Sequence, residues 1–167
     1  MILFCNDYQE GCHPLILQRL SESNLCQTTG YGEDEYCARA RELVKKACGR
    51  EDADVHFLVG GTQTNATVIA SVLKPYQGVV CPTTGHINVH ETGAIEHCGH
   101  KVLAVPSANG KISSVSLDAV LEAHFNEDGP EHGVQPGMLY ISYPTELGTL
   151  YSLEELRSLR MVCGARL

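Results

Sequence analysis

A short apolar run that gives way to two glycines and then to a helical pattern is the feature that most constrains this chain. Residues 55–59 read Val-His-Phe-Leu-Val, Gly60 and Gly61 follow, and the apolar spacing resumes over residues 66–73. This order predicts a strand, a turn and a helix. The unpaired N–H groups and the positive end of the helix dipole at such a turn can hold a phosphate. Alone the signal is weak, because glycine turns between strands and helices are common.

Strand-like and helical patterns alternate along most of the sequence. The expected strands are 55–59, 79–81, 101–105 and 138–142, and the expected helices are 36–48, 65–73, 91–97, 117–125 and 152–162. Residues 126–137 read as a polar loop, and residues 1–36 as an irregular arm around a short apolar piece at 15–20. Short apolar strands separated by helices are typical of an α/β fold, with a mostly parallel sheet covered by helices on both faces.

The composition limits the class of protein. At 167 residues the chain is long enough for one domain with a real core. A net charge of −8 argues against a nucleic-acid partner. No apolar run approaches the roughly 18 residues of a membrane helix, and the first residues lack the basic segment of a signal peptide. A soluble, cytoplasmic protein is therefore expected, with its eight cysteines reduced.

A cluster of imidazoles and a thiol raises zinc binding as an alternative. The cluster comprises His86, His90, His97, Cys98 and His100. However, no H-E-x-x-H motif is present, and the last three residues lack a second well-spaced pair of ligands. Histidines on a polar helix face explain the pattern better, so no metal site is predicted.

Several short motifs, taken in order, resemble those of one enzyme family. They are Asn-Asp at 6–7, Gly-Tyr-Gly-Glu-Asp at 30–34, Gly-Thr-Gln-Thr-Asn-Ala at 61–66, Gly-His-Ile at 85–87 with Glu-Thr-Gly-Ala at 91–94, the segment 143–153, and Gly-Ala-Arg-Leu at 164–167. The sequence resembles the threonine aldolases of the β-eliminating lyase group, and most closely the low-specificity branch. The resemblance implies a pyridoxal-phosphate (PLP) enzyme of fold type I, the aspartate-aminotransferase fold.

The resemblance also implies roles for residues around the cofactor. Gly61, Thr62 and Gln63 would bind the PLP phosphate. His86 would stack on the pyridine ring and stand near the substrate hydroxyl, where it could act as an acid or base. Without the family resemblance, the simpler interpretation of His86 is a loop histidine that makes hydrogen bonds.

Four further residues would bind the substrate if the resemblance holds. Asn6 and Arg166 would contact the amino-acid carboxylate, with Arg166 using its bidentate fork. Tyr31 would help to build the site of a neighbouring subunit, which implies a homodimer or homotetramer. Glu146 could equally touch the substrate or close a turn. The implied reaction is aldol cleavage of a small β-hydroxy amino acid, L-threonine or L-allo-threonine, to glycine and acetaldehyde.

The chain also departs from the family pattern. Relatives carry the cofactor-binding lysine beyond the motif found here at 164–167, and they have Asp where this chain has Cys163. A thiol does not hold the pyridine proton as a carboxylate does. We expect residues 1–36 to be an arm and residues 37–167 to be part of a PLP-binding large domain without its lysine or small domain. Such a chain would be catalytically incomplete alone; the alternative is a truncated isoform that associates with a full-length subunit.

Overall fold

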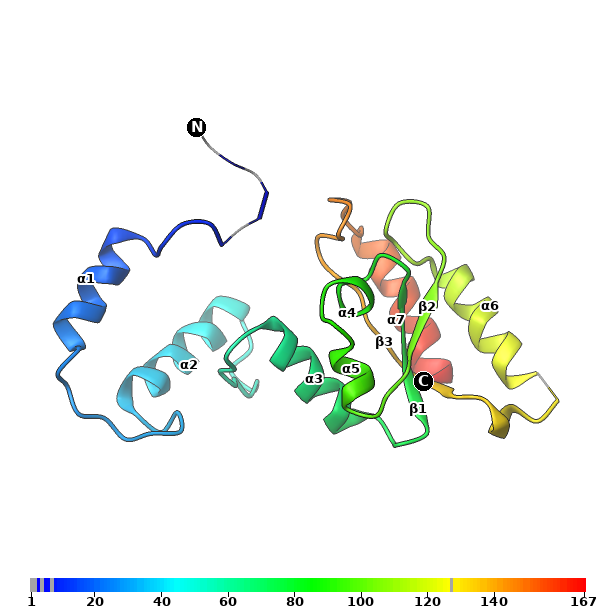
Figure 1. Ribbon diagram of the computed structural model, residues 1–167, viewed down its shortest axis with the longest axis horizontal. Helices are drawn as coiled ribbons and strands as arrows, with labels where there is room; N and C mark the ends of the chain where they lie inside the picture. The colour runs from blue at the N-terminus through cyan, green and yellow to red at the C-terminus, as the bar shows by residue number, and fades with distance from the viewer. Residues whose placement is uncertain (1–2, 4, 7, 127) are drawn as a thin grey trace. The chain divides into compact units, whose positions relative to one another are not determined.

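The chain divides into two compact units, which are described separately. The computed structural model describes residues 3, 5–6, 8–126 and 128–167 (Figure 1). One unit comprises Met1–Phe57 and the other Leu58–Leu167. The expected division between an arm (1–36) and a domain (37–167) stays a prediction.

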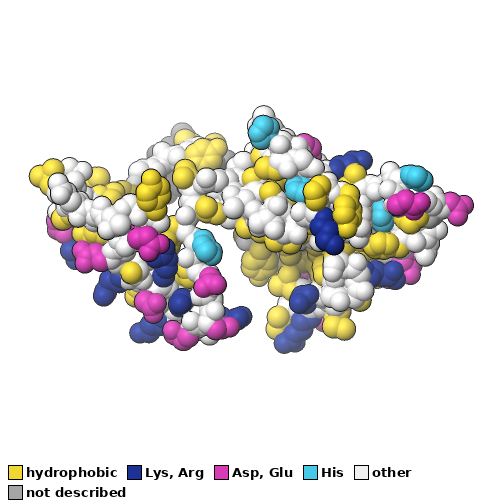
Figure 2. Space-filling view, turned by 90° about the horizontal axis from the view of Figure 1, so that it is seen from below, with side chains coloured by type: hydrophobic (Ala, Val, Ile, Leu, Met, Phe, Trp, Pro, Cys, Tyr) yellow, Lys and Arg dark blue, Asp and Glu magenta, His cyan; other side chains and the backbone are white. Residues whose placement is uncertain are grey.

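Among the described residues of the first unit there are two helices, α1 (Pro14–Ser23) and α2 (Glu35–Cys48). The prediction of an irregular segment around residues 15–20 is wrong, because α1 begins there with Pro14 in its first turn, where proline fits a helix. Helix α2 was predicted, and Asp34 caps its N-terminus with a carboxylate that accepts a hydrogen bond from the Cys37 N–H at 2.9 Å. No described residue of either helix is buried, and Figure 2 shows hydrophobic side chains at the surface of this unit.

The second unit is built on a three-stranded sheet in the order β2-β1-β3. The strands are β1 (Gln77–Pro82), β2 (Val102–Val105) and β3 (Gln135–Leu139), and both pairings are parallel. Val79 pairs with Val102, and Val80 pairs with both Leu103 and Leu139. The predicted parallel arrangement is confirmed, and three of the four predicted strands are present, although β3 begins and ends earlier than expected.

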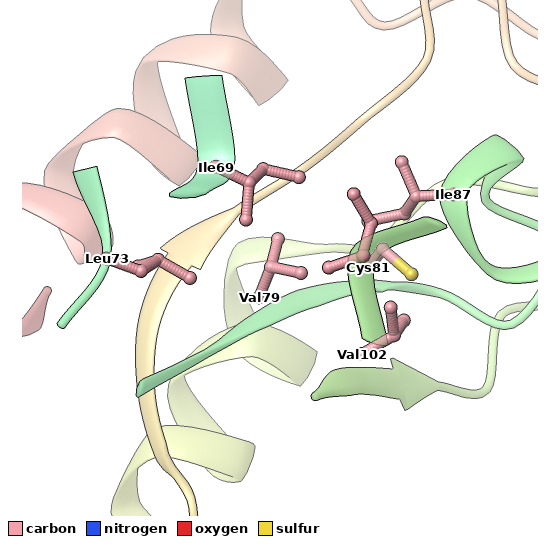
Figure 3. Packing of buried hydrophobic residues seen from close by; sticks show 7 residues of the cluster. Ile69, Leu73, Val79, Cys81, Ile87 and Val102 are labelled. Carbon is pink, nitrogen blue, oxygen red and sulfur yellow. The ribbon is translucent and has the colours of Figure 1, made fainter. Parts of the chain in front are cut away.

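Helices cover both faces of this sheet. Alternate residues of β1 point to opposite sides, so Val79 and Cys81 pack in one hydrophobic cluster and Val80 in another. The first cluster joins β1 to α3 (Gly61–Val72), α4 (His86–Val89) and α5 (Ala94–His97), and Figure 3 shows its side chains converging. The second joins β1 to α6 (Ser114–Phe125) and α7 (Leu153–Arg166). A short 3-10 helix, η1 (Pro130–His132), lies between α6 and β3.

The strand predicted at residues 55–59 is wrong. Within the described chain these residues pair with no strand, and side chains engage their backbone instead. Arg41 donates to the Val55 carbonyl at 3.3 Å, and the Val59 N–H donates to Gln63 Oε1 at 2.8 Å. The Val59 side chain is exposed, so this apolar run lacks the two covering layers that stabilise a parallel strand.

Several predicted helices differ in extent from the observed ones, and α3 and α6 begin earlier than expected, at Gly61 and Ser114. The helix expected at 91–97 forms only over its last four residues, as α5, because Thr92 and Gly93 before it adopt positive φ angles of 53° and 72°. The short helix α4, which precedes this range, was not predicted. Helix α7 begins at the predicted capping box, formed by Ser152 and Glu155, but it continues to Arg166. In the described part of the chain, no helix is long and apolar enough to cross a membrane.

Candidate functional site

The N-terminus of α3 offers free N–H groups to a ligand. Gly60 precedes the helix with an extended backbone, no side chain caps it, and its first turn contains no acidic residue. The first intrahelical contact is the 3.0 Å hydrogen bond from the Thr64 N–H to the Gly60 carbonyl, so the N–H groups of the preceding three residues have no helical partner. A methyl group added at Gly60 or Gly61 would meet no atom within 4 Å. This open, uncapped terminus of a 12-residue helix fits a phosphate.

A buried carboxylate joins α3 to the segment that follows β1. Glu91 Oε1 accepts a hydrogen bond from Asn65 Nδ2 at 2.6 Å and lies 2.7 Å from His86 Nδ1. The Glu91 side chain is fully shielded from solvent. Its second oxygen, Oε2, is buried without a hydrogen-bond partner among the described residues. These contacts place the His86 ring next to the first turns of α3.

The backbone around His86 is shaped by a close approach to β1. Gly85 donates its N–H to the Pro82 carbonyl at 2.7 Å. A methyl group at Gly85 would lie 3.0 Å from that carbonyl oxygen and 3.2 Å from Cys81, so only glycine fits without displacement. His86 opens α4 directly after this turn, beyond the carboxyl end of β1, which is where α/β sheets bind ligands.

A second histidine and a second carboxylate extend the network. The rings of His86 and His90 lie 5.4 Å apart at an angle of 55°. His90 Nε2 is 3.9 Å from Glu146 Oε2, and Glu146 Oε1 accepts a hydrogen bond from Ser142 at 3.0 Å. The structure therefore brings Glu146 to the same group of polar side chains as His86.

Tyr140 closes the network at the end of β3. Its hydroxyl lies 3.4 Å from Asn65 Nδ2, and burial raises the pKa of the phenol, with the Glu91 carboxylate adding to the effect. Tyr140 therefore stays a neutral hydroxyl across the physiological pH range. The sequence motifs contain Asn65 and Glu91 without predicting a role for either, and Tyr140 lies in the strand predicted at 138–142. The position of Tyr140 beyond a buried strand was the signal that could have identified it.

Arg166 lies elsewhere, at the end of α7. Its Nε is 2.7 Å from Asp118 Oδ1 and its Nη2 is 3.0 Å from Glu122 Oε1, so it pairs with two carboxylates of α6. Helix α6 packs in the hydrophobic cluster on the opposite side of β1 from α3. The structure therefore does not bring Arg166 to the His86 network, and its predicted contact with a substrate carboxylate stays a prediction.

The remaining residues that the family resemblance singled out lie in the first unit or in α7. Asn6 and Tyr31 lie in the first unit, where Asn6 Oδ1 accepts a hydrogen bond from the Tyr8 N–H at 3.1 Å and Tyr31 is fully exposed with a φ of 62°. Cys163 lies within α7, and burial raises the pKa of its thiol. Among the residues that the structure describes, no group of three or more His, Cys, Asp or Glu side chains is placed to hold a metal ion.

Known proteins resemble this chain in both sequence and structure. It is 30% identical to the low specificity L-threonine aldolase of Pseudomonas sp. (strain NCIMB 10558), covering 96% of this chain and 45% of that protein. It is 28% identical to the enzyme of the same name from Pseudomonas aeruginosa, with the same coverage of both. A solved structure of threonine aldolase from Leishmania major superimposes with a TM-score of 0.89 at 43% identity, covering 96% of this chain and 46% of that one.

These comparisons confirm the predicted resemblance and the fold class. The sheet with its covering helices corresponds to part of the fold type I architecture of threonine aldolase. The chain spans less than half the length of the curated relatives that it matches. Residues 18–166 match the β-eliminating lyase family, and the chain belongs to that family.

Proposed function

We propose that this chain forms part of a PLP site that cleaves L-threonine or L-allo-threonine to glycine and acetaldehyde. The observation that carries the proposal is the hydrogen-bonded connection from Asn65, in the second turn of α3, through Glu91 to His86, which sets an imidazole beside the helix whose N-terminus is uncapped. The names of the two Pseudomonas relatives, low specificity L-threonine aldolase, support this choice of reaction.

The cofactor phosphate would be held by the chain's own backbone. The N–H groups of Gly61, Thr62 and Gln63 point from the uncapped start of α3, and the helix dipole favours an anion there. When bound, PLP supplies an electron-withdrawing ring that weakens the Cα–Cβ bond of an attached amino acid. His86 would contact this ring and exchange a proton with the β-hydroxyl of the substrate.

The substrate would be bound by residues from several parts of the assembly. Glu146 lies near His90, so its carboxylate would be one of the polar groups that face the substrate. Asn6 and Arg166 remain candidates for the substrate carboxylate, although Arg166 would first have to leave Asp118 and Glu122. Tyr31 would act on the site of a neighbouring copy, so the proposal includes a homodimer or homotetramer, located in the cytoplasm.

We further propose that the chain does not catalyse the reaction by itself. Cys163 stands where relatives carry an aspartate, and because burial raises its pKa the thiol stays neutral and cannot pair with a protonated ring nitrogen. Of the five lysines, Lys111 is bound to Glu155 of α7. Association with a complete subunit remains the alternative role.

Binding and catalysis can be tested separately. Titration of the purified chain with PLP, and in parallel with pyridoxal, measures how much of the affinity comes from the phosphate. We expect PLP to bind and pyridoxal to bind at least tenfold more weakly. Incubation with PLP and L-threonine should release no more acetaldehyde than a control without protein. Acetaldehyde well above that control would refute the proposed incompleteness, whereas equal affinity for the two compounds would refute the phosphate site.

A further inference from the structure

We infer that Glu91 is a positioning residue that fixes the neutral His86 imidazole with its proton on Nδ1, which leaves Nε2 as the atom that accepts a proton in the site. The role of His86 as a base rests on the proposed function. The position of the proton itself follows from contacts within this chain.

The donors around Glu91 determine the direction of the hydrogen bond. Asn65 can only donate through Nδ2, so its 2.6 Å contact makes Glu91 Oε1 an acceptor. His86 Nδ1 lies 2.7 Å from the same oxygen. Because this carboxylate oxygen already accepts the hydrogen of Asn65, we assign it as the acceptor of the second contact too, so the hydrogen there comes from Nδ1. A proton placed on Glu91 Oε2 would be buried without an acceptor in the described structure.

The opposite ring nitrogen is left available. Within the described residues, His86 Nε2 makes no hydrogen bond, and 41% of the His86 side chain is exposed to solvent. A free imidazole in water carries its proton mainly on Nε2, whereas a hydrogen bond from Nδ1 to a carboxylate favours the other form. The Glu91 contact therefore converts Nε2 from a donor into an acceptor, which is the form that a general base requires.

Elements from three parts of the fold hold Glu91 in place. Asn65 comes from α3, and its amide also approaches the Tyr140 hydroxyl beyond β3 at 3.4 Å. Gly93, with a φ of 72°, follows Glu91 and allows the chain to turn into α5. Because the Glu91 side chain is fully buried, rotation of the carboxylate away from His86 would break both of its hydrogen bonds.

The test is a long-range ¹H–¹⁵N correlation spectrum of the full chain with ¹⁵N-labelled histidine, without cofactor, at about pH 9, where ordinary imidazoles are neutral. His86→Gln identifies the His86 signals by their loss. We expect the His86 pattern to show a protonated Nδ1 and an unprotonated Nε2. In Glu91→Gln the amide can donate as well as accept, so the pattern should move towards a proton on Nε2.

Glu131→Gln is the matched control, because Glu131 lies beside the exposed His132, with 3.7 Å between their side-chain atoms. It should leave the His86 signals unchanged. If Glu91→Gln fails to fold, the spectrum of the wild-type chain decides by itself. A wild-type His86 with its proton on Nε2 overturns the inference. A fixed Nδ1 proton in a chain that binds no PLP would sustain the inference and refute the proposed function.

Discussion

Asn65 and Glu91 are 26 residues apart in the chain and are joined by a 2.6 Å hydrogen bond. The bond connects the glycine-led helix α3 with the histidine segment that follows β1. Each half of the candidate site is a common local structure by itself. Their connection through a buried carboxylate is what distinguishes this arrangement from a chance grouping of polar residues.

Removing the Asn65 amide should destabilise the second unit. Asn65→Ala leaves Glu91 Oε1 with one hydrogen bond fewer in a buried position, which costs about 1–3 kcal/mol of unfolding free energy. Asn126→Ala, at an exposed position in the same unit, should change it by less than about 0.5 kcal/mol. Urea unfolding followed by circular dichroism measures both. Equal effects would show that the Asn65 contact adds nothing to stability.

The same substitution at two glycines should have opposite effects. Gly85→Ala places a methyl group 3.0 Å from the Pro82 carbonyl oxygen, and such overpacking costs about 1–3 kcal/mol. Gly61→Ala meets no atom within 4 Å in a helix, so it should stabilise the chain by about 0.5–1 kcal/mol. Thermal unfolding distinguishes the two. A neutral Gly85→Ala would show that the turn before His86 is not tightly packed.

Stability should fall at alkaline pH because of Cys81. Burial raises the pKa of this thiol from an ordinary value of 9.0 to about 11. The unfolded chain therefore loses the proton first, and stability decreases as the pH rises from about 9 to about 11, with no contribution to the slope below pH 9. Unfolding free energies measured across that range should show a weaker slope in Cys81→Ala. An identical slope in both proteins would contradict the assignment.

The ion pairs of Arg166 should contribute little and should weaken in salt. Because its partners Asp118 and Glu122 are partly exposed, Arg166→Gln should cost less than about 1 kcal/mol. The difference should shrink in 1 M salt, where the Debye length is about 3 Å. Arg157→Gln, an exposed position on the same helix, is the control. A large, salt-independent loss would point to a packing role for Arg166 instead.

The apolar side chains of α1 should promote self-association. Leu15, Leu17 and Leu20 are each more than half exposed, and exposed apolar patches favour association. Sedimentation velocity should show oligomers or aggregates of the purified chain, and Leu17→Lys should reduce them. Ser21→Lys, on the same helix, adds the same charge without removing an apolar side chain. A monodisperse monomer in the unmodified chain would contradict this expectation.

Sequence patterns predicted the parts of the fold in which local signals and burial agree. The run containing Val79 and Val80, which are both fully buried, lies in the central strand β1, and the Ser152 capping box opens α7 as expected. The strand predicted at 55–59 is absent from the described residues because the apolar periodicity of a segment does not reveal whether a neighbouring strand is available to pair with it. Pro14, in the first turn of α1, is the sequence signal that marks the start of this helix.

The candidate site was only partly visible in the sequence. His86 and the glycine turn stood out because their residue types and spacing have a direct chemical meaning. The bond between Asn65 and Glu91 depends on how α3 packs beside β1, which no local pattern encodes. Arg166 was assigned from a motif, whereas in the structure the motif lies within α7 and the guanidinium pairs with Asp118 and Glu122 of α6.

The most direct test of the phosphate site compares two substitutions at Gly60. Its extended backbone accepts any residue, and an added Cβ atom meets no atom within 4 Å. Gly60→Asp would place a carboxylate where the phosphate should bind and would cap the free N–H groups, whereas Gly60→Ala would leave them open. We predict that the affinity for PLP falls at least tenfold in Gly60→Asp, about 1.4 kcal/mol, and stays near that of the unmodified chain in Gly60→Ala. Equal PLP affinity in both variants would contradict binding at the α3 N-terminus.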